Sequence, residues 1–73
     1  MIAKEYNTLS LDDQLNLVIS QGRFIEIVIR PGLKSVYFSF REFFAEVNWS
    51  AEIDEIVSIT GYETEDYLSV TKC

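Results

Sequence analysis

The sequence predicts an α+β domain, in which an N-terminal helix packs on a four-stranded antiparallel meander. Two observations support this class. One apolar stripe with helical spacing occurs near the start of the 73-residue chain, and alternating runs rich in β-branched and aromatic residues follow it. Consecutive strands joined by short turns usually pair with each other, which gives a meander. No repeat or linker-like segment divides the chain, so we expect a single small domain over residues 1–73.

The helix is predicted over residues 11–21. Ser10 is a favourable N-cap before it, and Gly22 is a typical stop after it. Between them, apolar residues recur at i, i+4, i+7 and i+8 and so form one stripe: Leu11, Leu15, Val18 and Ile19. The helix therefore has one face to bury.

Four segments are predicted as strands from their alternation: residues 23–30, 34–40, 43–49 and 55–60. Pro31 and Gly32 suit the two central positions of a type II turn, because proline fixes φ at the first and glycine tolerates positive φ at the second. The first two strands should therefore form a hairpin. Residues 64–70 are the candidate for a short closing helix.

Strict alternation divides the sheet into two faces. We expect one apolar set beneath the helix: Ile25, Ile27, Ile29, Val36, Phe38, Phe40, Phe43, Val47, Trp49 and Val57. A second apolar set is left for the opposite face: Phe24, Val28, Tyr37, Phe44 and Ile56. One helix cannot cover both faces, so either the C-terminal segment or another chain should cover the second one.

The composition excludes several kinds of chemistry. The chain has no histidine, which removes the commonest general base and the usual zinc ligands. Its three glycines are far apart, so no phosphate-binding loop is present, and Cys73 is the single cysteine. We therefore expect no enzymatic activity, no metal and no cofactor.

The chain is acidic, with a net charge of −6, and a hydrophobic share of 48% is typical of a folded domain. No apolar run reaches the length of a signal peptide core or a membrane span. A small domain without a disulfide framework suits a reducing compartment. We expect a cytoplasmic protein that does not enter a membrane.

The main functional prediction is a non-enzymatic protein-interaction domain that forms a homo-oligomer, because contiguous apolar patches usually mark interfaces. The partner would be a second copy or another protein chain, and sheet-edge pairing is a further route to assembly. The predicted interface lies on the second face and consists of Phe24, Val28, Tyr37, Phe44, Glu46 and Ile56.

Two alternatives remain. Aromatic rings beside a basic residue can stack single-stranded nucleic acid, which would require Phe24, Tyr37, Phe44 and Arg30, although the negative net charge opposes it. Two carboxylates, Glu26 and Glu46, would be the catalytic pair of a small-ligand enzyme. A meander places their strands two apart, which separates them by roughly 10 Å.

The chain also resembles a group of short, uncharacterised bacterial proteins. The resemblance is carried by a leading helix, the Gly-x-Phe start of the first strand at Gly22 and Phe24, and the Phe-Phe-x-Glu-Val strand that begins at Phe43. It extends over residues 10–70 and implies the same architecture. Because the group has no established activity, the resemblance adds no catalytic residue.

Overall fold

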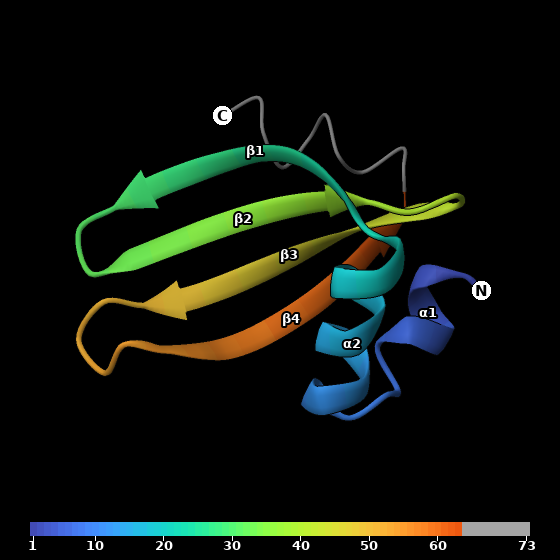
Figure 1. Cartoon of the computed structure of the whole chain (residues 1–73), viewed down its shortest axis with the longest axis horizontal. Helices are drawn as coiled ribbons and strands as arrows, with labels where there is room; N and C mark the ends of the chain where they lie inside the picture. Colours follow the sequence, from blue (N-terminus) through green and yellow to red (C-terminus); the bar gives the residue numbers. More distant parts are fainter. Residues whose placement is uncertain (64–73) are drawn as a thin grey trace.

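The computed structural model describes residues 1–63 and has two helices followed by four strands (Figure 1). The elements are α1 (Ala3–Tyr6), α2 (Leu11–Gln21), β1 (Arg23–Arg30), β2 (Leu33–Ser39), β3 (Phe43–Ser50) and β4 (Glu55–Glu63). The strands pair antiparallel in the order β1-β2-β3-β4, which confirms the predicted α+β class and the meander. The candidate helix 64–70 lies outside the described residues.

The helix cap and the turn that the sequence predicts are both present in the structure. The Ser10 hydroxyl accepts a hydrogen bond of 3.2 Å from the backbone N–H of Asp13 and so caps α2. At the β1–β2 turn Gly32 has φ = 77°, a left-handed conformation that glycine adopts at little cost. The short helix α1 was not predicted, because four residues are too few to show a period.

Two irregularities in the sheet change which residues share a face. Phe24 lies opposite Phe38, but Glu26 lies opposite Tyr37, so Ile25 has no residue opposite it. The extra residue of a β-bulge shifts the alternation by one position. The prediction that Phe24 lies on the same face as Tyr37 is therefore wrong: Phe24 faces the helix side.

A second bulge occurs between β3 and β4. Ile56 lies opposite Trp49 and Ser58 lies opposite Asn48, so Val57 has no residue opposite it. Ile56 consequently lies on the helix side, where it packs against the core, and its predicted place on the second face is wrong. Val57 was expected in the core but is 48% exposed, because it is the bulged residue.

The core lies between the helices and the β3–β4 side of the sheet, where the main helix–sheet contacts are made. Its buried members are Ala3, Tyr6, Val18, Phe43, Ala45, Val47 and Ile59. In Figure 1 both helices lie over the end of the sheet where β4 finishes, and the opposite end extends beyond them. Ile27 and Ile29 on β1 were expected beneath the helix, but they are 47% and 76% exposed. An 11-residue helix is only about 16 Å long and does not reach them.

Candidate functional site

A chain of polar side chains crosses the sheet on the face opposite the helices. Arg30 donates from Nη2 to Ser35 Oγ at 3.0 Å, and the Ser35 hydroxyl donates to Asn48 Oδ1 at 2.7 Å. Asn48 Nδ2 then donates to Glu46 Oε1 at 3.0 Å. β1, β2 and β3 each supply members of this chain, so it links three neighbouring strands.

Glu46 is the acceptor at which this polar chain ends. The Tyr37 hydroxyl donates to Glu46 Oε2 at 2.6 Å, and the Tyr62 hydroxyl donates to Oε1 at 3.5 Å. Burial raises the pKa of Tyr37 well above its ordinary value, and the nearby Glu46 carboxylate raises it further. The pKa of Tyr62 is raised by the same two causes in the same order. Both tyrosines therefore stay protonated near neutral pH and act as donors to one carboxylate.

The two carboxylates proposed as a catalytic pair lie in the same row of the sheet but not side by side. Glu26 lies opposite Tyr37, and Tyr37 in turn lies opposite Glu46. Two inter-strand spacings separate the acidic residues by roughly 10 Å. The Tyr37 side chain stands between them and bonds to Glu46. In this arrangement the two carboxylates do not share a proton directly.

The aromatic residues of the second face are buried. Tyr37 and Phe44 are 3% and 2% exposed, and the Phe44 ring stacks on Tyr62 with centroids 5.3 Å apart. Phe24 lies on the other face, against Phe38. The four residues considered for nucleic acid stacking, Phe24, Tyr37, Phe44 and Arg30, therefore do not form one platform. Of the six predicted interface residues, Val28, Tyr37, Phe44 and Glu46 share the second face, whereas Phe24 and Ile56 do not.

The helix side of the sheet carries the larger exposed apolar area. Ile19 on α2 is 74% exposed, and Phe24, Ile27 and Ile29 on β1 are 61%, 47% and 76% exposed. We call these four residues the apolar surface. Ile27 lies beside Val36 of β2, so the β1 residues adjoin the middle of the sheet.

A groove of about 270 Å³ lies between α2 and the sheet and adjoins the apolar surface. It is lined by Leu15, Val18, Ile19, Lys34, Val36, Phe38, Val47, Trp49 and Ile56. The ammonium of Lys34 lies 4.4 Å from the centre of the Trp49 ring, a cation–π contact at the edge of an otherwise apolar lining. The groove therefore suits an apolar side chain better than a charged substrate.

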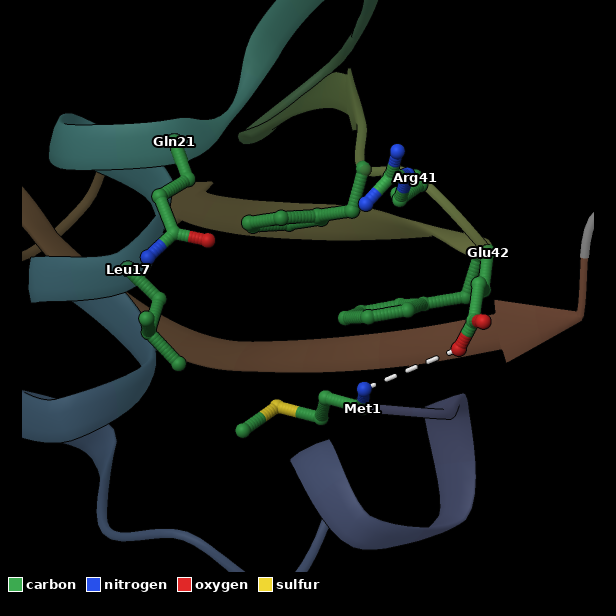
Figure 2. Close-up of a pocket in the computed structure, with 7 residues that line it drawn as sticks. Met1, Leu17, Gln21, Arg41 and Glu42 are labelled. Atoms are coloured by element: carbon green, nitrogen blue, oxygen red, sulfur yellow. Dashed lines mark ion pairs between the residues drawn. The ribbon is translucent and has the colours of Figure 1, made fainter.

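A second pocket, of about 410 Å³, lies between α2 and the β2–β3 turn (Figure 2). The rings of Phe40 and Phe43 stack there with centroids 4.7 Å apart, and the Met1 amino group lies 3.6 Å from a carboxylate oxygen of Glu42. The side chains of Leu17, Gln21 and Arg41 complete the lining. Its charged groups have both signs, so it shows no clear preference for an anion or a cation.

Within residues 1–63 no group of three or more potential metal ligands occurs, and no helix has the length and apolar character that a membrane span requires. Comparison with known proteins gave no match to a family model, a curated protein or a solved structure. The function is therefore inferred from the surfaces of this chain.

Sequence reasoning missed the apolar surface for an identifiable reason. The adjacent apolar pairs Phe24–Ile25 and Ile56–Val57 interrupt strict alternation, and both pairs coincide with the bulges. That signal does not locate a bulge by itself, because Ile27, Val28 and Ile29 are also adjacent apolar residues and pair in regular register. Tyr62 was missed as a partner of Glu46 because the fourth strand was expected to end at residue 60, whereas β4 extends to Glu63.

Proposed function

We propose that this chain is a non-enzymatic protein-interaction domain that self-associates through the helix side of its sheet. The observation that carries the proposal is the apolar surface formed by Ile19, Phe24, Ile27 and Ile29, whose exposed fractions lie between 47% and 76%. A contiguous exposed patch of this kind marks an interface more often than an isolated apolar residue does.

Removing the exposed apolar side chains from water would favour association. Fully burying an isoleucine or phenylalanine side chain stabilises a structure by about 1.5–3 kcal/mol relative to leaving it in water. Covering the apolar surface with a partner therefore supplies several kcal/mol, part of which offsets the entropy lost on association.

The proposed interface differs from the set of residues expected on the second face. Tyr37 and Phe44 are buried within the chain, so they offer little surface to a partner. Phe24 remains in the proposed interface, but it lies on the helix side. The interacting face is thus the one that carries α2, at the part of the sheet that the helix leaves exposed.

The test is the solution mass measured by light scattering across a range of protein concentrations. The wild-type mass should rise with concentration, and Ile29→Glu should keep the chain monomeric, because a charge then replaces the most exposed residue of the apolar surface. Val57→Glu is the matched control: it adds the same charge at an exposed apolar residue of β4, on the other edge of the sheet. A wild-type protein that stays monomeric at every concentration contradicts the proposal.

A further inference from the structure

The β1 strand is one edge of the sheet, and its sequence is complementary to itself. We infer that two copies of this chain pair antiparallel through β1, with Val28 on the two-fold axis, and so form one continuous eight-stranded sheet. This inference rests on the proposed self-association and places its contact at the β1 edge, where Ile27 and Ile29 of the apolar surface meet those of the second copy; Ile19 and Phe24 lie outside this strand contact.

The edge of β1 is open in the described part of the chain. Within residues 1–63 its strand partner is β2 alone, and the helices make their main contacts with β3 and β4. An edge strand presents unpaired N–H and C=O groups, which another strand can pair. β1 is eight residues long and contains neither proline nor lysine, and its bulge at Ile25, another feature that protects edges, lies outside residues 26–30, which the pairing uses. It is therefore suited to adding a strand.

The charges of β1 select one register. When two identical strands pair antiparallel about an axis at Val28, Glu26 lies opposite the Arg30 of the second copy, and Ile27 lies opposite its Ile29. Each contact occurs twice by symmetry. The register therefore creates two ion pairs on one face and two apolar pairs on the other, where both isoleucines belong to the apolar surface.

Neighbouring registers lose these contacts. Directly opposite residues must lie on the same face, so the axis has to pass through a residue. An axis at Ile27 places Glu26 opposite Val28, and an axis at Ile29 places Val28 opposite Arg30. Axes at Glu26 or Arg30 place like charges opposite each other, which is destabilising. The register centred on Val28 is the one that matches both charges.

Both charged residues can keep their contacts within the chain. Arg30 donates to Ser35 at 3.0 Å, and Glu26 also takes part in an interaction within its own chain. A guanidinium has five N–H donors and a carboxylate has about four acceptor sites. Each residue therefore has capacity for a second partner across the edge.

Charge reversal tests the register. Each of the variants Glu26→Arg and Arg30→Glu should weaken dimerisation by roughly 3- to 30-fold, because two exposed ion pairs are replaced by repulsions. An equimolar mixture of the two variants should restore dimerisation, since each then supplies the charge that the other lacks. Restoration also shows that both variants fold.

Arg23→Glu is the control for net charge, because it changes the charge by the same amount as Arg30→Glu but has no partner in β1 in this register. Its dimerisation should stay within about three-fold of wild type. Sedimentation velocity across concentration measures all of these dissociation constants.

A cysteine at the axis gives an independent readout. In Val28→Cys on a Cys73→Ser background, the two new thiols belong to opposite residues with Cα atoms about 4.5–5.5 Å apart, within the range for a disulfide. Mild oxidation should give a covalent dimer, whereas Val57→Cys on the same background should not.

The outcomes separate the two proposals. Self-association that Ile29→Glu abolishes but that the charge-reversed mixture does not restore overturns the β1 register and leaves the proposed function standing. Failure of Val28→Cys to cross-link a wild-type-like oligomer also overturns the register. A monomer at all concentrations overturns both.

Discussion

Within residues 1–63, the two edges of the sheet differ in what lies against them. At β4 the side chain of Asn7 pairs with the edge as a strand would: its Nδ2 donates to the Gly61 carbonyl at 3.0 Å, and its Oδ1 accepts from the Gly61 N–H at 2.6 Å. β1 has no equivalent among the described residues, and it carries Phe24, Ile27 and Ile29 in exposed positions. The N-terminal segment therefore closes the β4 edge, whereas within residues 1–63 no segment pairs with the β1 edge on its outer side.

The closure of β4 depends on close packing as well as hydrogen bonds. A Cβ atom at Gly61 would lie 3.0 Å from Cδ2 of Tyr6 and 3.4 Å from the Ala3 carbonyl, so α1 lies directly against the strand. Tyr6 is held in turn by α2, since its hydroxyl donates to the Gln14 carbonyl at 2.8 Å and Gln14 Nε2 donates to the Tyr6 carbonyl at 3.0 Å. A four-residue helix can therefore protect the edge of a sheet when a longer helix holds it in place, as α2 holds α1 here.

The largest effect is expected from removing that anchor. Tyr6 is fully buried and contacts the rings of Phe40 and Phe43, so Tyr6→Ala should lower the free energy of unfolding by about 3–5 kcal/mol. Urea unfolding measures the change. Tyr6→Phe keeps the ring and loses only the bond to Gln14, so it should cost about 1 kcal/mol. Equal losses in the two variants would contradict the anchoring role of the ring.

Opening the β4 edge should have the next largest effect. Asn7→Ala removes both hydrogen bonds to Gly61 and should cost about 1–3 kcal/mol. The amide proton of Gly61 should then exchange with solvent much faster, which hydrogen-exchange NMR detects. Asn7→Asp is the matched variant, because it retains an acceptor for the Gly61 N–H but replaces the donor with a second carboxylate oxygen, which faces the Gly61 carbonyl. Unchanged exchange in Asn7→Ala would show that something else protects this edge.

Much of this architecture could be predicted because its signals are local. The Ser10 cap and the apolar stripe specify α2, and Pro31 with Gly32 specifies the first hairpin. The bulges at Ile25 and Val57 could not be placed, since counting with a period of two assumes that no residue is extra. A single bulge moves every later side chain of its strand to the other face.

The candidate interface was harder to predict than the fold. Alternation assigned Ile27 and Ile29 to the helix side correctly, but it does not say how far a helix extends over a sheet. That extent depends on where Tyr6 and Asn7 fix the N-terminal segment, and contacts between residues so distant in sequence leave no periodic signal. Because contacts distant in sequence leave no periodic signal, Tyr37 and Phe44 of the second face were expected to be exposed, whereas in the structure they are buried.

A loss of similar size is expected from crowding the closed edge directly. Gly61→Ala places its methyl group 3.0 Å from Tyr6 and should cost about 1–3 kcal/mol, because the ring must shift from its packed position. Gly32→Ala is a useful contrast. A Cβ atom there would have open space, with Oε1 of Glu52 3.9 Å away, but φ = 77° strains any L-residue by about 1 kcal/mol. Thermal unfolding measures both losses, and hydrogen-exchange NMR distinguishes the two variants, since only Gly61→Ala should also speed exchange along β4.

The smallest effect concerns alkaline pH and again separates the two edges. Burial raises the pKa of the Tyr6 hydroxyl to about 12, above the value of 10.0 expected for an unfolded chain. The folded state therefore holds this proton more tightly, so the stabilisation is complete below pH 10 and is lost as the pH rises towards 12. Stability measured by urea unfolding should fall over this interval, and the fall should be shallower in Tyr6→Phe. Because Tyr6 packs on Gly61, amide exchange at β4 should accelerate between pH 10 and 12 more than amide exchange at β1 does. Equal acceleration at both edges would indicate that the titration of Tyr6 does not act locally.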